Sequence, residues 1–317
     1  MTRQNAPETS QDCDSSGSQT PVEASLPGVL SFNASDPVGA GGLSSDALVV
    51  ASVGAHLAPI VTGVYLRDTR ECTDHAPLDD AIVAEQAHLI AEDMPLQAVK
   101  VGFAGSAEAV AAIAAFVSDY PSLPVVTYMP DLSWWDEHEI VNYHDAVREL
   151  LLPQTAVLVG NNATLRHWLL PESASRRTAG STDLARAAAE LGVSYVLVTG
   201  LAEAGDQLAS VLASPQEELA RQSFERIDAG FLGAGDILSA ALAGLLAMGS
   251  DLTEAAVEAL QYLDQALDHG FRPGMGRAVA DRLFWVEVDD PAESAEDAQR
   301  GDAPSENLPY PFNETKH

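Results

Sequence analysis

Short apolar runs alternate with longer helical segments along most of this chain. Runs rich in β-branched residues predict strands at 29–32, 60–65, 98–102, 124–128, 156–159 and 195–199. Segments rich in Ala and Leu with helical spacing predict helices at 44–53, 78–94, 106–119, 135–151, 182–191, 235–248 and 253–267. Strands that alternate with helices form a parallel sheet, because each crossover helix returns over one face. We therefore expect a three-layer α/β fold with a mostly parallel central sheet, helices on both faces, and one or two antiparallel edge strands within 201–227.

The two ends of the chain have a different composition from the middle. Residues 1–28 are rich in Ser, Thr, Pro and acidic residues, and residues 289–317 are similarly polar and acidic. Such segments bury too little apolar surface to offset the entropy lost on ordering. We expect a disordered leader at 1–28, a folded domain at 29–288 and a flexible acidic tail at 289–317.

Charge and composition exclude several classes of partner. The chain has 16 basic and 47 acidic residues, a formal net charge of −31, which opposes binding to nucleic acid and to anionic membranes. No apolar run approaches the roughly 20 residues of a membrane-spanning helix, and the N-terminal residues lack the pattern of an export signal. The two cysteines, Cys13 and Cys72, form no disulfide framework and have no metal-site spacing. We expect a cytoplasmic protein.

One lysine stands where a surface lysine is not expected. Lys100 lies inside the apolar run AVKVGF. A desolvated ammonium group is costly unless it has a partner. Either Lys100 is buried beside a charged partner, or its side chain reaches solvent from the end of a strand.

The segment 31–56 contains a glycine-rich loop between a predicted strand and a predicted helix. Gly39, Gly41 and Gly42 lie in the loop, and Asp46 follows in the first helical turns. Glycines let backbone amides approach a ligand, and the start of a helix offers unpaired N–H groups. The same pattern is also found in a simple tight turn followed by a helix cap, so the residues alone leave both interpretations open.

The segment 231–249 carries a second and sharper motif. Gly233, Ala234 and Gly235 precede a long apolar helix, so several amide groups would point to one place and form an anion site. Asp236 lies in the first turn of that helix. Its carboxylate either complements the helix dipole or, in a phosphoryl-transfer site, takes the proton of an attacking hydroxyl group.

Several segments together resemble the hydroxymethylpyrimidine and phosphomethylpyrimidine kinases of thiamine biosynthesis, in the ribokinase-like superfamily. The similar segments occur in the family's order between residues 29 and 286: SDPVGAGGLSSD, VTGVYLRDT, VKVGF, PVVTYMP, LLPQTAVLVGNN, YVLVTG and PGMGRAVADRLFW. The resemblance implies a ribokinase-like fold, ATP and Mg²⁺ as cofactors, and a homodimer. It implies an ATP-dependent kinase that phosphorylates the hydroxymethyl group of a hydroxymethylpyrimidine, and it leaves open whether the phosphate is phosphorylated in a second step.

The resemblance also implies roles for individual residues. Asp236 would be the catalytic base, and the amides of Gly233, Ala234 and Gly235 would form the anion hole. The substrate would contact the following residues: Gly39, Gly41, Gly42, Asp46, Arg67 and Phe103. The nucleotide would contact the following residues: Asn161, Thr199, Gly200 and Gly244. Trp134 and Trp135 are interpreted as packing residues.

Several positions depart from the family pattern. Arg67 replaces a glutamine that recognises the pyrimidine, and a guanidinium group suits an acid or a phosphate better than a neutral ring. Tyr128 and Thr164 replace two acids near the metal and phosphate site, which leaves the metal ligands open. Asp236 replaces the family's usual cysteine, as in sugar kinases. Two alternatives follow: a catalytically weak paralogue that senses a nucleotide or metabolite, or a kinase of a pyridoxal-like or other anionic substrate.

Overall fold

The computed structural model describes residues 26–170, 179–227 and 229–286. Of the predicted leader at 1–28, only residues 26–28 lie within these ranges, and Gly28 already begins the first strand; the predicted tail at 289–317 lies outside them. Among the described residues, no helix is both long enough and apolar enough to cross a bilayer.

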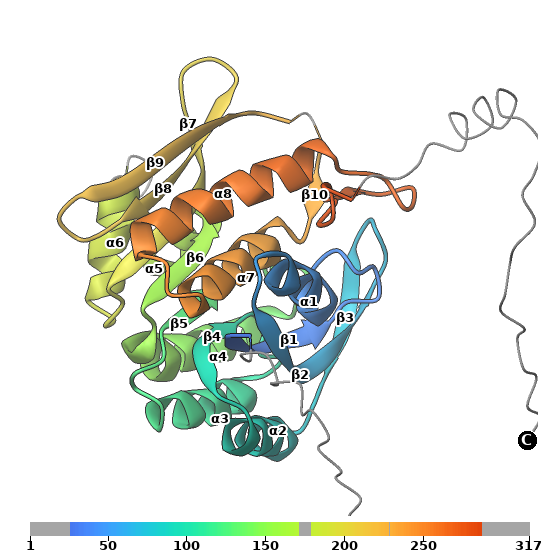
Figure 1. Cartoon of the computed structure of the whole chain (residues 1–317), viewed down its shortest axis with the longest axis vertical. Coiled ribbons are helices and arrows are strands. Elements are labelled where there is room, and N and C mark those ends of the chain that lie inside the picture. The colour runs from blue at the N-terminus through green and yellow to red at the C-terminus, as the bar shows by residue number, and fades with distance from the viewer. Residues whose placement is uncertain (1–25, 171–178, 228, 287–317) are drawn as a thin grey trace, which may run out of the picture.

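Nine of the described strands form one sheet, in the order β3-β2-β1-β4-β5-β6-β7-β8-β9 (Figure 1). The six strands from β2 to β7 in this order are parallel, whereas β3, β8 and β9 pair in the antiparallel sense. The strands span Gly28–Ser35 (β1), His56–Arg67 (β2), Cys72–Pro77 (β3), Leu96–Val101 (β4), Val125–Tyr128 (β5), Val157–Asn161 (β6), Tyr195–Ala202 (β7), Gln207–Ala213 (β8) and Glu218–Glu225 (β9). The expected mostly parallel sheet is confirmed, and so are the two antiparallel strands within 201–227.

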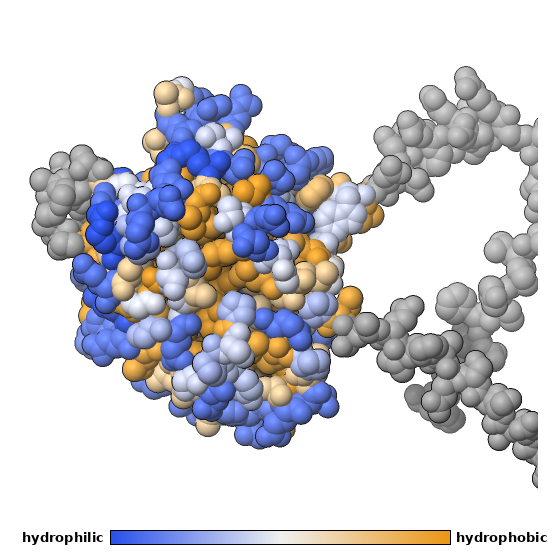
Figure 2. All heavy atoms as spheres, turned by 60° about the vertical axis from the view of Figure 1, so that its left-hand side comes forward, coloured by the Kyte–Doolittle hydropathy of each residue, from blue (hydrophilic) through white to orange (hydrophobic). Residues whose placement is uncertain are grey.

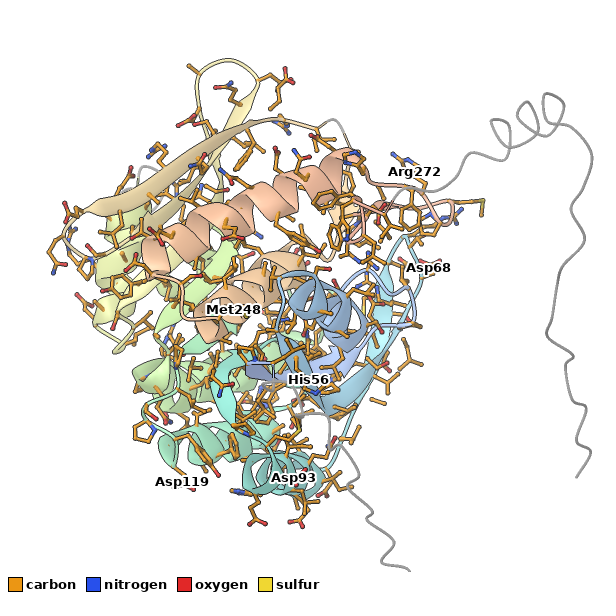
Figure 3. The ribbon with its side chains drawn as sticks, viewed as in Figure 1. His56, Asp68, Asp93, Asp119, Met248 and Arg272 are labelled. Carbon is orange, nitrogen blue, oxygen red and sulfur yellow. The ribbon has the colours of Figure 1, made fainter. Side chains whose placement is uncertain are left out.

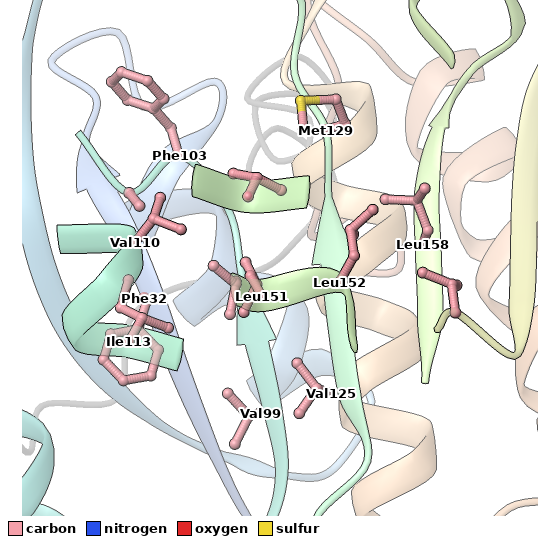
Figure 4. Packing of buried hydrophobic residues seen from close by; sticks show 14 of the residues in the cluster. Phe32, Val99, Phe103, Val110, Ile113, Val125, Met129, Leu151, Leu152 and Leu158 are labelled. Carbon is pink, nitrogen blue, oxygen red and sulfur yellow. The ribbon is translucent and has the colours of Figure 1, made fainter. Parts of the chain in front are cut away.

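Helices cover both faces of the sheet (Figures 1 and 3). One face carries α1 (Gly42–Ser52), α7 (Ala234–Ala247) and α8 (Leu252–Asp268), which pack on one apolar core. The other face carries α2 (Asp80–Asp93), α3 (Ala107–Ser118), α4 (Glu137–Ala146), α5 (Asn162–Leu169) and α6 (Ser181–Ala189), which pack on a second core around Phe32, Ile113 and Leu152 (Figure 4). The expected three layers are therefore confirmed.

Some local predictions differ from the structure. The helix expected at 135–151 begins at Glu137 and gives way to a π-helical turn at Val147–Leu151. The strand β3, the helix α5 and a small parallel pair, β10 (Phe231–Leu232) with β11 (Ala278–Val279), were not predicted. These elements have only two to eight residues each, too few for a periodic apolar pattern to stand out in the sequence.

The order of the strands places a crevice at the carboxyl ends of β1 and β4. The chain passes from β1 to β2 on one side, and β4 pairs with β1 on the other side. Ligands of open α/β sheets bind where the strand order reverses in this way. The turn after β2 and the loop after α8, marked by Asp68 and Arg272 in Figure 3, meet near this edge: the Gly276 amide donates to Thr69 Oγ1 at 3.0 Å.

Candidate active site

A cavity of about 570 Å³ opens at the carboxyl edge of the sheet. Both glycine-rich segments reach it, because Gly41, Gly42 and the bend at 233–235 line its wall together with Asp236. These segments lie almost 200 residues apart in the sequence, yet the Gly42 amide donates to Asp236 Oδ2 at 3.2 Å. The structure thus brings the two motifs into direct contact.

The bend before α7 has a backbone that only glycine adopts readily. Gly233 has φ = +77°, and a Cβ atom there would overlap the carbonyl group of Ala40 in the first loop. Gly233 follows β10 and is the N-cap of α7, so the first residues of α7 have amide groups without helical partners and line the cavity. The bend therefore supplies a site for an anion beside Asp236.

A buried charge cluster holds Asp236. Lys100 is fully buried, and its Nζ lies 2.6 Å from Asp46 Oδ1 and 2.9 Å from Asp236 Oδ1. Asn33 Nδ2 donates to both carboxylates, at 3.1 Å to Asp46 Oδ2 and 2.8 Å to Asp236 Oδ1. Ser31 Oγ donates to Asp46 Oδ2 at 2.8 Å. Lys100 therefore has two charged partners, which settles the alternative left open by the sequence.

The pKa values of the two carboxyl groups in the cluster shift in opposite directions. Burial opposes the charge of Asp236, but Lys100 and the hydrogen bonds from Lys100, Asn33 and Gly42 outweigh it and hold the pKa of Asp236 below its ordinary value. Burial dominates at Asp46 and raises its pKa. Burial also disfavours the ammonium form of Lys100, yet the carboxylates of Asp236 and Asp46 raise its pKa. Asp236 is thus a carboxylate at neutral pH, and its side chain is 14% exposed toward the cavity.

The other wall of the cavity combines aromatic rings with an arginine. Tyr65, Trp134 and Arg67 line it. The nearest carboxylate to Arg67 is Asp36, at 3.9 Å from Nε, and the oxygens of Asp36 already accept the amides of Val38 and Gly41. Within the described part of the chain, the two terminal amino groups of Arg67 have no hydrogen-bond partner. This wall can contact a flat ring that carries polar or anionic groups.

Three of the residues predicted to contact the nucleotide, Asn161, Thr199 and Gly200, lie toward the carboxyl ends of β6 and β7. Asn161 and Thr199 are paired in register and both line the large cavity. Thr199 and Gly200 also line a neighbouring cavity of about 320 Å³ with largely apolar walls from β8, β9 and α8. Figure 2, in which the left-hand side of Figure 1 comes forward, shows hydrophobic residues among hydrophilic ones across the middle of that face.

Four residues expected to touch ligands do not reach the cavity. Asp46 is fully buried, contacts Lys100 and does not line the cavity. Phe103 is 1% exposed and stacks on Tyr65, at 5.4 Å between ring centroids, so Tyr65 is the ring that faces the cavity. The carbonyl oxygen of Gly39 accepts from Arg282 Nη2 at 2.8 Å, away from the cavity wall.

Gly244 is the fourth of these residues, and it serves helix packing. It is buried in α7, and a Cβ atom there would lie 2.5 Å from Cγ2 of Val53 at the end of α1. Gly244 lines neither of the two cavities described above, so its contact with a nucleotide stays a prediction.

Gly244→Val is expected to lower the free energy of unfolding by about 1–3 kcal/mol, because the added methyl groups overpack the contact between α7 and α1. The affinity for ATP should stay the same. Urea unfolding and nucleotide titration measure the two quantities. A weaker affinity for ATP with an unchanged free energy of unfolding would show that Gly244 contributes to nucleotide binding.

Sequence reasoning missed Asp36, Asn33, Tyr65 and the role of Trp134 at this site. Trp134 was expected only to pack, and it both packs on Phe103 and lines the cavity. The position of Lys100 in an apolar run was the one signal of the buried cluster.

A divalent cation would find few carboxylates here. No group of three acidic, histidine or cysteine side chains within the described ranges could hold a metal ion. Asp131 and Asn161 line the cavity. Mg²⁺ is commonly bound by one or two carboxylates together with substrate phosphates, so these two residues fit a cation that arrives with a nucleotide.

Comparison with known proteins identifies the family of this chain. Residues 36–281 match the pattern of a family described as phosphomethylpyrimidine kinase. A hydroxymethylpyrimidine/phosphomethylpyrimidine kinase of Rhizobium meliloti is 30% identical over 256 residues, which cover 78% of this chain and 93% of that protein. A thiamine biosynthetic bifunctional enzyme of Arabidopsis thaliana is 27% identical over 252 residues, 77% of this chain; the chain spans only 47% of that longer protein.

A solved structure shows the same fold. The ADP complex of Bacillus subtilis pyridoxal kinase superposes with a TM-score of 0.72 at 20% identity, over 82% of this chain and 99% of that one. The ribokinase-like fold expected from the sequence is confirmed. On the family match, which covers most of the folded residues, the chain belongs to the phosphomethylpyrimidine kinase family.

Proposed function

We propose that this protein is an ATP-dependent kinase that phosphorylates the hydroxymethyl group of a hydroxymethylpyrimidine in thiamine biosynthesis. The observation that carries the proposal is the carboxylate of Asp236, which opens to the cavity at the amino end of α7 and touches the first glycine loop. The names of the relatives support the same activity. We further propose that the protein is cytoplasmic and that it forms a homodimer. Light scattering of the purified protein tests the homodimer.

Asp236 would act as the general base. Its Oδ1 is held by Lys100 and Asn33, and its Oδ2 by the Gly42 amide, which leaves Oδ2 free on its other side for a substrate hydroxyl group. As the proton moves to Oδ2, the hydroxyl oxygen bonds to the γ-phosphorus of ATP and the bond to the leaving ADP oxygen breaks. The amides of Gly233, Ala234 and Gly235 would stabilise the charge on the transferred group.

The nucleotide would lie across the ends of β6 and β7. Thr199 and Gly200 would contact it, with the adenine ring in the apolar cavity of about 320 Å³. Asn161 and Asp131 would hold Mg²⁺ on the phosphates, where the cation supplies positive charge to the phosphoryl group. The flat ring of the substrate would lie against Tyr65 and Trp134 on the opposite wall.

The direct test is turnover by the purified protein with magnesium and ATP. We expect ADP to form with a hydroxymethylpyrimidine and not with ribose. Nucleotide-induced thermal stabilisation without turnover of any compound in a panel of hydroxymethylpyrimidines, pyridoxal and ribose would instead favour a nucleotide sensor.

Arg67 favours a second candidate, a kinase of a pyridoxal-like or other anionic ring. The observation is that Arg67 lines the cavity with its guanidinium carbon 5.9 Å from the centroid of the Tyr65 ring, while its terminal amino groups have no hydrogen-bond partner among the described residues. A hydrogen bond to a charged group contributes about 1.5–3 kcal/mol, so Arg67→Gln should raise the KM of an anionic substrate at least about 10-fold.

The same substitution should lower the KM of a neutral hydroxymethylpyrimidine, because glutamine offers an acceptor as well as donors. Steady-state kinetics of the variant with both classes of substrate measure this change. Equal effects on the two classes would show that Arg67 does not select the substrate, and Arg70→Gln, an exposed change outside the cavity wall, is the matched control.

A further inference from the structure

Tyr128 stands at the carboxyl end of β5, where its ring lies against the start of α7. A Cβ atom at Gly235 would overlap three atoms of this ring, Cε2, Cζ and Oη. Only glycine fits beneath the ring at that position. The hydroxyl end of Tyr128 is therefore held against the bend that carries the unpaired amides of α7.

Tyr128 is part of the cavity wall, and its hydroxyl group is unpaired among the described residues. Tyr128 lines the cavity beside Gly235, Asp236 and Asn161. Among the described residues, no hydrogen bond engages its oxygen. The Tyr128 oxygen is not one of the buried polar atoms that lack a partner, so it is accessible from the cavity and can donate its one hydrogen bond to a ligand there.

We propose that the Tyr128 hydroxyl donates a hydrogen bond to the phosphoryl group while that group is transferred, which makes Tyr128 a further catalytic residue. This inference rests on the proposed kinase function. The amides of the bend approach the phosphoryl group from α7, and the hydroxyl approaches it from β5. The hydroxyl lies beside the amides at the same bend, so both elements would stabilise the charge that develops on the oxygens of one anion.

Burial and two nearby carboxylates keep the hydroxyl group of Tyr128 protonated. Burial is the largest cause, and the carboxylates of Asp236 and Asp131 add to it, so that the pKa of Tyr128 is well above its ordinary value. At neutral pH the group is a neutral donor. The carboxylate expected at this position from the family resemblance could only accept a hydrogen bond or bind a cation, so tyrosine changes what this position contributes.

The test is Tyr128→Phe, which removes the hydroxyl group and keeps the ring against Gly235. Loss of one preorganised donor costs about 10²-fold in kcat, and we expect a loss of that size with little change in KM for either substrate. The free energy of unfolding should not fall. Tyr195→Phe, at the opposite end of the sheet on β7, is the matched control and should leave kcat unchanged.

A binding measurement gives a readout that does not depend on turnover. The affinity for MgADP is measured by calorimetry with and without aluminium fluoride, which imitates a phosphoryl group in transfer. Aluminium fluoride should tighten MgADP binding to the wild type, and Tyr128→Phe should lose most of that gain while binding MgADP alone as before.

The outcomes separate this inference from the proposed function. If the wild type phosphorylates no substrate, the proposed function fails. If the wild type is active and Tyr128→Phe has the same kcat and the same fluoride-dependent affinity, the inference about Tyr128 is overturned and the kinase assignment stands. A rise in KM alone would also overturn it, because the hydroxyl would then bind the substrate before transfer.

Discussion

Asp236→Asn is expected to lower kcat by about 10²- to 10⁴-fold, the range found when a general base is removed. Asparagine has nearly the same shape as aspartate, and Lys100 keeps its second partner, Asp46, so the cluster should stay assembled. The amide group cannot take a proton from the attacking hydroxyl group. Steady-state kinetics with saturating ATP measure the loss, and calorimetry should find an ATP affinity close to that of the wild type.

The matched control for this substitution is Asp119→Asn, just after α3 and far from the cavity wall. It makes the same chemical change and should leave kcat unaltered. Turnover that survives in Asp236→Asn would show that another group accepts the proton. A parallel loss of ATP affinity would indicate that the carboxylate organises the nucleotide and not the proton transfer.

Lys100→Met is expected to lower the free energy of unfolding by about 3–5 kcal/mol, because it leaves a fully buried carboxylate at Asp46 and a mostly buried one at Asp236 without their cation. Methionine fills nearly the same volume, so packing contributes little to the loss. Urea unfolding at pH 8 measures it. Burial already raises the pKa of Asp46, and without Lys100 that pKa rises further.

The sign of the pH dependence follows from that raised pKa. Below the ordinary value of 3.8, Asp46 is protonated in both the folded and the unfolded protein, so its burial carries no charge penalty. As the pH rises above that value, the unfolded chain releases its proton and the folded variant does not. The loss of stability in Lys100→Met should therefore be smallest near pH 4 and grow toward pH 8.

A double substitution tests whether the two charges are coupled. Asp46→Asn in the Lys100→Met background removes the more deeply buried unpaired charge, so the double variant should be more stable than Lys100→Met alone at pH 8. Simple addition of the two single losses would show that the 2.6 Å contact between Lys100 and Asp46 contributes no coupling energy.

The fold could be predicted from the sequence because its elements have strong local patterns. The strands β4 and β7 are apolar runs, and α7 is an apolar helix that begins at a glycine bend, so each was predicted within two or three residues of its observed bounds. The short strand β3 is mostly exposed, and its pairing with β2 depends on contacts that an alternating pattern does not reveal.

Some residues of the site could be recognised from local sequence features, and others could not. The bend at 233–235 and Asp236 were found from the sequence, because glycines before a helix and an acid in its first turn are local features. The sequence also marked Lys100 as anomalous, but its two partners come from α1 and α7, and only folding brings them within 3 Å of one ammonium group.

Which residues touch the cavity was decided by the tertiary structure alone. Family resemblance pointed to Asp46 and Phe103, yet each lies one layer behind the residue that faces the cavity, Asp236 and Tyr65. Periodicity and motifs specify which residues belong to an element and roughly which face is buried. They do not specify the depth of a side chain, because depth depends on what other elements place in front of it.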